Sequence, residues 1–149
     1  MEPTRPAPSL PTGIRAAGRR VTTVAGIVLA VSAFTGWYTT ADSEPGPTLA
    51  VIGWHVGVLG KLVFVIGLAL VILALLRPLG LVLPPAVPES LVAMALGALA
   101  TVFLLIRLID VPDAFLPATG RGAGIWISLV AAIAGIVGGL LEAFADLDR

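Results

Sequence analysis

Three charged residues could take part in chemistry at a membrane surface: Lys61, Arg107 and Asp110. Arg107 and Asp110 are three positions apart, so on a helix they share a face and can form an ion pair. Lys61 begins an apolar stretch, and we expect it at a depth similar to that of Arg107. Two cations beside one carboxylate can bind an anionic lipid headgroup or small solute. An interfacial ion pair with a lysine reaching the headgroups is the alternative, and both interpretations stay open.

Composition excludes several other kinds of chemistry. The chain has no cysteine and a single histidine, so thiolate nucleophiles, iron–sulfur clusters and multi-histidine metal centres are not expected. Nine basic residues balance nine acidic ones, which argues against a nucleic-acid-binding face. We predict no cofactor and no metal site. An integral membrane enzyme is the alternative, but no nucleophile–base pair supports it.

The elements that must position these residues are apolar helices. Hydrophobic residues make up 58% of the chain and charged residues 12%, against about 25% charged residues in a soluble domain. The segment 49–76 contains one charged residue, Lys61, and is flanked by Asp42 and Glu44 before it and by Arg77 and Pro78 after it. At about 1.5 Å per residue, such a run matches a hydrocarbon layer roughly 30 Å thick. The segment is therefore predicted to span a membrane.

The same pattern recurs and predicts four spans, at about 21–38, 56–76, 89–109 and 125–141. The predicted fold is all-α, an antiparallel four-helix transmembrane bundle. Residues 1–20 read as a disordered, proline-rich basic tail, and 142–149 as a short acidic tail. A cleaved signal peptide is an alternative for the first span, because Arg19 and Arg20 precede an apolar core that includes the small residues Ser32 and Ala33.

Two aromatic residues end the first predicted span. We expect Trp37 and Tyr38 at the level of the lipid headgroups, with their polar tips in water. Residues 39–48 and 116–124 are predicted to be loops, since they are rich in proline and glycine.

Basic residues set the predicted orientation. With four spans and the N-terminus inside, six basic residues lie on the inner side and three on the outer side. The inner set is Arg5, Arg15, Arg19, Arg20, Arg77 and Arg149, and the outer set is Lys61, Arg107 and Arg121. We therefore predict a multi-pass protein of the plasma (inner) membrane with both termini cytoplasmic.

Small residues recur at helical spacing in two spans. The second span offers Gly53, Gly57, Gly60 and Gly67, and the fourth offers Gly124, Ser128, Gly135 and Gly138. Helices in lipid associate through such close-packing stripes. The stripes either build the four-helix bundle itself or leave one face for self-association or another membrane protein.

The order of several short motifs resembles a known group of proteins. These motifs are a basic tail, Gly36-Trp37-Tyr38 after the first span, Gly53-Trp54 before the second, and Arg107-Leu108-Ile109-Asp110 closing the third. Over about residues 21–141 the chain is similar to uncharacterised small four-span integral membrane proteins of actinobacteria. The resemblance implies a fold and a plasma-membrane location, and no activity.

The functional prediction follows from these features. We expect a structural or accessory subunit of a membrane complex, with the lipid bilayer and a membrane protein, or a second copy, as its partners. The alternative is a small oligomeric transporter, or a protein that binds an anionic lipid or solute through Lys61, Arg107 and Asp110.

Overall fold

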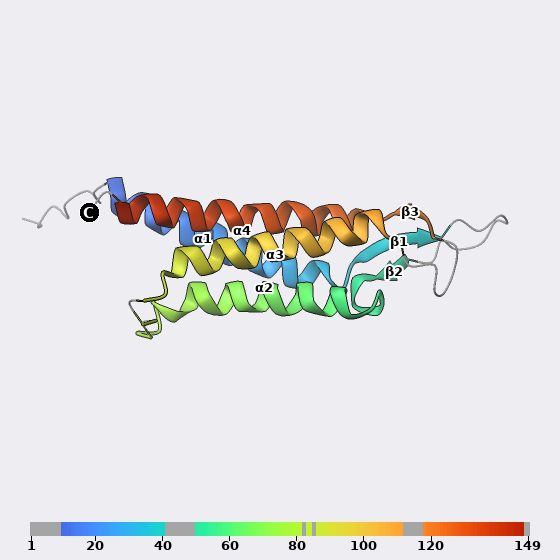
Figure 1. The fold of residues 1–149 in the computed structure, drawn as a ribbon, viewed down its shortest axis with the longest axis horizontal. Helices are drawn as coiled ribbons and strands as arrows, with labels where there is room; N and C mark the ends of the chain where they lie inside the picture. The colour runs from blue at the N-terminus through green and yellow to red at the C-terminus, as the bar shows by residue number, and fades with distance from the viewer. Residues whose placement is uncertain (1–9, 41–49, 82, 85, 112–117, 148–149) are drawn as a thin grey trace, which may run out of the picture.

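The computed structural model describes residues 10–40, 50–81, 83–84, 86–111 and 118–147. They form the α-helices α1 (Leu10–Ser32), α2 (Val58–Leu76), α3 (Glu89–Ile109) and α4 (Ala123–Leu147). The strands β1 (Gly36–Thr40), β2 (Ala50–Ile52) and β3 (Ala118–Arg121) and the 3-10 turn η1 (Gly53–His55) gather at one end of the elongated bundle (Figure 1). We name this the sheet end. The opposite end, where α1 and α3 begin and α2 and α4 finish, is named the charged end.

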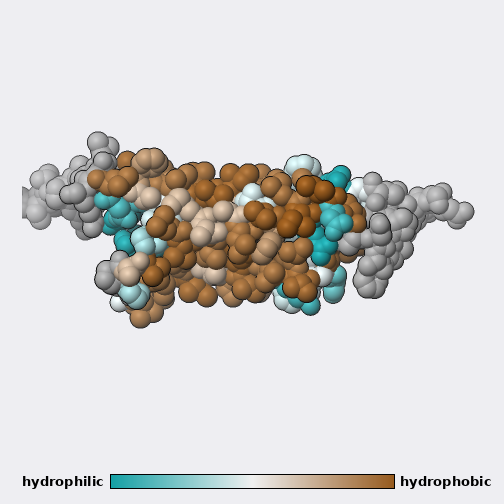
Figure 2. All heavy atoms as spheres, in the orientation of Figure 1, coloured by the Kyte–Doolittle hydropathy of each residue, from teal (hydrophilic) through white to brown (hydrophobic). Residues whose placement is uncertain are grey.

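Three of these helices are long and apolar enough to cross a membrane: α2, α3 and α4. Their 19, 21 and 25 residues correspond to about 28, 32 and 38 Å, which covers a hydrocarbon core. Figure 2 shows a broad hydrophobic surface between hydrophilic patches at the two ends of the bundle. Membrane-compatible helices are therefore confirmed by length and composition.

Helix α1 differs from the predicted first span at both ends. It begins at Leu10, so residues 10–20 are helical, and their prediction as a disordered tail is wrong. It finishes at Ser32, six residues before the predicted limit, and backbone bonds from Ala33 to Ala30 and from Phe34 to Val31 tighten its last turn. Every 18-residue window of α1 contains three arginines, which sets it apart from the other helices. Residues 1–9 of the predicted tail lie outside the described residues.

The helices pack through backbone-to-backbone approaches at glycine. A Cβ on Gly67 of α2 would lie 2.6 Å from the backbone nitrogen of Ala30 on α1. A Cβ on Gly97 of α3 would lie 2.9 Å from the backbone nitrogen of Ile136 on α4. Helix α1 contacts α2 and α4, and α4 also contacts α3. These approaches bring the antiparallel helices close enough to bury a shared core.

A three-stranded antiparallel sheet forms where the sequence predicted the end of the first span (β1), the beginning of the 49–76 span segment (β2) and a loop (β3). The strand order is β2-β1-β3, and Tyr38 of β1 faces Val51 of β2 and Arg121 of β3. The all-α prediction therefore needs correction at this end. Aromatic and β-branched residues in β1 favour a strand, and pairing satisfies backbone groups that would otherwise lie unbonded beside an apolar bundle.

Helix α2 carries only part of the glycine stripe that was predicted for the second span. Helix α2 begins at Val58, so Gly53 belongs to η1 and Gly57 precedes the helix. The φ of Gly57 is 103°, a conformation that glycine adopts readily and that allows the sharp entry into α2. Gly60 and Gly67 are the members of that stripe that α2 carries, and both are buried.

Candidate functional site

At the sheet end, Trp37 and Tyr38 are interior residues. Their side chains are 0% and 2% exposed, so the prediction that their polar tips lie in water is wrong. The indole nitrogen of Trp37 donates a hydrogen bond of 2.8 Å to the carbonyl oxygen of Ser32, at the end of α1. A buried indole N–H requires such a partner. Both rings are therefore anchored in the interior, Trp37 on the last turn of α1 and Tyr38 on the last turn of α3.

Side chains from β1 and β3 bond the last turn of α3. The Tyr38 hydroxyl donates to the carbonyl oxygen of Arg107 at 2.6 Å, and Arg121 Nε donates to the carbonyl oxygen of Leu108 at 2.8 Å. The last carbonyls of a helix have no partner within it, so these contacts satisfy them and fix the sheet on α3. Burial raises the pKa of the Tyr38 hydroxyl above its ordinary value, and the cations Arg107 and Arg121 oppose that shift.

Arg107 lies at the junction of α3 and the entry to α2. A Cβ on Gly57 would lie 3.1 Å from Arg107 Nη2, so the guanidinium reaches the start of α2. Its Nε is buried and has no hydrogen-bond partner among the described residues. Asp110 follows the last turn of α3 and is exposed. Within the described part of the chain, no salt bridge joins the two, and the pairing expected from their spacing is not formed.

Lys61 has different neighbours. Its Nζ lies 5.7 Å from the centre of the Trp54 ring, a cation–π geometry. Trp54 stacks on Phe34 at 5.4 Å, and Phe64 packs edge-on against both rings. These aromatic residues come from the end of α1, from η1 and from α2. The contact holds Lys61 on an aromatic surface.

The structure thus divides the predicted polar cluster. Arg107 and Asp110 lie near Tyr38 and Arg121, whereas Lys61 lies over Trp54. Sequence spacing placed the three at one end of the bundle but could not determine which direction Lys61 faces.

The charged end holds a second polar group that the sequence analysis treated as tails and loops. Arg77, just after α2, forms an ion pair of 2.7 Å with Glu89 at the start of α3. Arg15 of α1 forms an ion pair with Asp146 of α4. The first pair joins the end of α2 to the start of α3, and the second joins α1 to α4. The electrostatic contacts at this end therefore act between helices.

Glu142 is part of helix α4, and its prediction as the start of a solvated tail is wrong. Its Oε1 accepts a hydrogen bond of 3.5 Å from Thr22 Oγ1 on α1. The residue lies beside a cavity of about 10 Å³ shared with Arg19 and Glu89, large enough for about one water. One signal in the sequence could have revealed this position, because Gly135, Gly138 and Glu142 continue one helix face at spacings of three and four.

The other small residues of the fourth span lie in the bundle interior. Gly124 approaches Thr35 and Trp37, and Gly138 approaches Thr22. The Ser128 hydroxyl donates to the Ser32 hydroxyl at 2.7 Å across α1 and α4. A Cβ on Gly135 would meet Leu70 at 3.3 Å. These positions build contacts within the chain.

The buried polar groups that the structure describes act within the fold. In the described ranges, no three or more histidine, cysteine, aspartate or glutamate side chains gather where they could hold a metal ion. The buried hydroxyls of Thr22, Ser32 and Ser128 bond backbone carbonyls. Buried polar groups thus act as links between and within helices.

Known proteins provide no further guide to the site. No family model, curated protein or solved structure matches this chain. The resemblance to four-span actinobacterial membrane proteins remains a prediction.

Proposed function

We propose that this protein is a four-span plasma-membrane protein with a structural or accessory role in a larger membrane assembly. Helices α2, α3 and α4 meet the length and composition required of spans. Helix α1 lies alongside α2 and α4, and its residues 21–32 carry no charge. In this proposal, arginines at the start of α1 remain at the charged end while its apolar part crosses the bilayer.

The proposed role rests on one observation: the polar side chains at both ends of the bundle bond other parts of this same chain. Ion pairs at the charged end and side-chain-to-backbone bonds at the sheet end hold elements of this chain together. Leu29, Leu70 and Leu104 fill the interior. The large apolar side chains on the helix exteriors therefore offer the surface on which a membrane partner would pack.

Co-purification tests the role. The full chain is extracted from its native membrane in mild detergent, and the proteins that accompany it are identified and quantified by mass spectrometry. A partner at fixed stoichiometry supports the accessory role. A chain that elutes alone as a stable monomer under conditions that preserve other membrane complexes contradicts it.

Single cysteines test the four-span topology, because the natural chain has none. The exposed positions Gly13 and Ala86 lie at the charged end, and His55 lies at the sheet end. In sealed vesicles, a membrane-impermeant maleimide should label Gly13→Cys and Ala86→Cys from one side and His55→Cys from the other. Labelling of Gly13→Cys from the same side as His55→Cys would show that α1 does not cross.

A further inference from the structure

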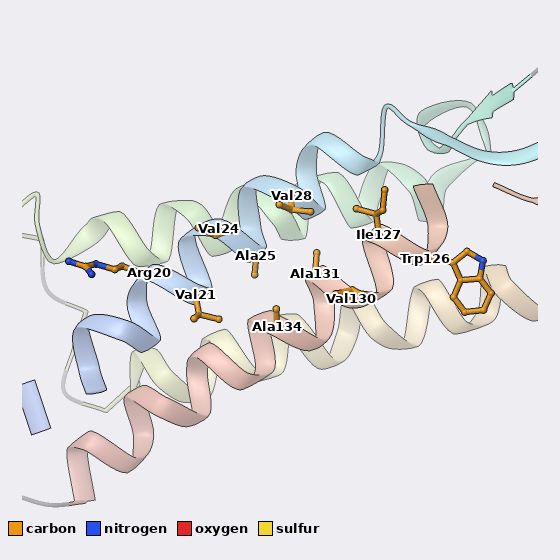
Figure 3. Close-up of a pocket in the computed structure, with 10 residues that line it drawn as sticks. All are labelled: Arg20, Val21, Val24, Ala25, Val28, Trp126, Ile127, Val130, Ala131 and Ala134. Carbon is orange, nitrogen blue, oxygen red and sulfur yellow. The ribbon is translucent and has the colours of Figure 1, made fainter. Parts of the chain in front are cut away.

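An apolar groove of about 620 Å³ runs between α1 and α4 on the exterior of the bundle (Figure 3). From α1 it is lined by Val21, Val24, Ala25 and Val28, and from α4 by Trp126, Ile127, Val130, Ala131 and Ala134. Its volume is within the range of about 300–1,000 Å³ that small-molecule sites occupy. Arg20 is its single charged residue.

The groove forms because α1 and α4 contact one another along the faces that point to the bundle interior, and not along their outer faces. Thr22 meets Gly138, and Ser32 bonds Ser128, on the side that faces the bundle interior. Those contacts join small residues, while the larger valines and isoleucine beside them project outward and leave a channel between their rows. The channel therefore opens where a membrane protein meets lipid tails.

Its two ends differ in chemistry. Figure 3 shows Arg20 at one end and Trp126 at the other. Arg20 is exposed and forms no ion pair with the described residues, whereas Arg15 and Arg77 at the same end are each paired. On α4, Glu142 bonds Thr22, which lies on another face of α1, and Asp146 pairs with Arg15. Arg20 is thus a cation at the mouth of an apolar groove.

We propose that this groove holds one acyl chain of an anionic phospholipid, with the lipid phosphate bound by Arg20. Arg20 to Val28 is eight positions, or about 12 Å along α1, which is most of the roughly 15 Å hydrocarbon depth of one leaflet. The acyl chain lies against valine and alanine, and the phosphate remains at the charged end beside Arg20. This inference concerns a site separate from the proposed accessory role.

A second copy of the chain fits the groove less well. Two copies inserted in the same direction and related by a two-fold axis along the membrane normal would place their Arg20 side chains at equal depth across the interface. Like charges would then face one another with no carboxylate from the described groove lining between them. An anionic lipid instead supplies the missing negative charge.

Native mass spectrometry of the full chain in an uncharged detergent tests the proposal, with added phosphatidylglycerol or phosphatidylcholine as probe. The wild type should retain one phosphatidylglycerol in preference to phosphatidylcholine. Arg20→Gln should weaken phosphatidylglycerol retention about fivefold, the effect of one basic residue near an anionic surface. Arg19→Gln removes the same charge at the same depth on another face and is the matched control. Equal losses in the two variants would overturn a site at Arg20.

A second pair of variants tests the acyl-chain part of the site. Ala134→Phe fills the groove and should reduce retention of phosphatidylglycerol, whereas Val137→Phe, exposed on α4 outside the lining, should not. Unchanged retention in Ala134→Phe contradicts the proposal. A wild-type dimer that Ala134→Phe converts to monomer also contradicts it, because a second copy would then be the occupant.

If Ala134→Phe does not fold, the fluorescence of Trp126 can test the proposal without any substitution in the groove. In a Trp54→Phe background, Trp126 is the exposed indole, since Trp37 is buried. Phosphatidylglycerol with brominated acyl chains should quench its fluorescence more strongly than brominated phosphatidylcholine at the same mole fraction. Equal quenching by the two lipids would overturn the proposal.

Discussion

The two ends of the helix bundle are held together by different kinds of interaction. At the sheet end, Trp37, Tyr38 and Arg121 donate hydrogen bonds to backbone carbonyls of α1 and α3. At the charged end, Arg77 pairs with Glu89, and Arg15 pairs with Asp146. One end uses directional bonds to backbone atoms beneath a sheet. The other uses charges on side chains that are partly exposed.

This difference has consequences for how each end responds to its surroundings. The bonds from the Trp37 indole and the Tyr38 hydroxyl to backbone carbonyls join uncharged groups, so they should be nearly insensitive to salt. Partly exposed ion pairs weaken as ionic strength rises, because the screening length falls to about 3 Å at 1 M salt. We expect the sheet end to be a rigid cap and the charged end to be the part that salt loosens.

Loss of the Trp37 side chain should have the largest effect. Trp37→Ala removes a fully buried ring and a hydrogen bond, and should lower the free energy of unfolding by about 3–5 kcal/mol. Unfolding in mixed micelles, followed by circular dichroism, measures the change. Trp126→Ala, at a side chain that is 50% exposed, is the control and should have a much smaller effect. Similar losses in both variants would mean that the sheet is not a packed cap.

A methyl group on Gly60 should have the next largest effect. Its Cβ would overlap the carbonyl oxygen of Gly53, a backbone atom that cannot rotate away, so Gly60→Ala should cost about 1–3 kcal/mol. Gly13→Ala is the matched helical control, because nothing lies within 4 Å of the added methyl group. It should stabilise the protein by about 0.5–1 kcal/mol in the same assay. If Gly60→Ala leaves the free energy of unfolding unchanged, η1 does not pack tightly against α2.

Removing the Tyr38 hydroxyl should have a smaller effect. Tyr38→Phe loses the bond to the Arg107 carbonyl and should lower stability by about 1 kcal/mol, independent of salt. The pKa of Tyr38 is raised by burial above 10.0, so the unfolded chain ionises first as pH rises. The contribution of Tyr38 is therefore fully present below pH 10 and is lost above it. Between pH 9 and 11 the free energy of unfolding should therefore fall less in Tyr38→Phe than in the wild type, because the variant lacks the ionising hydroxyl. Parallel curves of stability against pH for the two proteins would contradict a buried, hydrogen-bonded Tyr38.

The charged end should show the smallest effect and the one that depends on salt. Arg77→Gln removes a cation whose side chain is 38% exposed but keeps an amide that can donate to Glu89, and should cost about 0.5–1 kcal/mol at low ionic strength. The difference from wild type should shrink in 1 M salt. The exchange Arg77→Glu with Glu89→Arg should recover part of the loss. If the stability lost in Arg77→Gln does not depend on salt, and the double exchange recovers none of it, then the two ends do not differ in their response to salt.

Local pattern predicted the limits of α2 and α3 closely, but it missed both ends of α1 and the last residues of α4. Predicted limits of 56–76, 89–109 and 125–141 compare with α2 at 58–76, α3 at 89–109 and α4 at 123–147. Long apolar runs ended by proline or by charged residues leave few alternatives, since each run needs internal hydrogen bonding in lipid. Gly67, Ser128 and Gly138 lie where two helices approach closely, whereas Gly60 approaches η1 and Gly124 approaches Thr35 and Trp37.

The sequence by itself determined the presence of the apolar helices and the limits of α2 and α3, because these depend on composition and on periodicity along one segment. Tertiary structure decided the sheet, since β1, β2 and β3 are short and gain their hydrogen bonds from strands distant in the chain. It also decided that Lys61 faces Trp54, that Arg107 reaches the start of α2, and that Glu142 continues α4 against Thr22. A side chain's partner depends on how neighbouring helices are rotated, and that rotation is set by packing across the whole bundle.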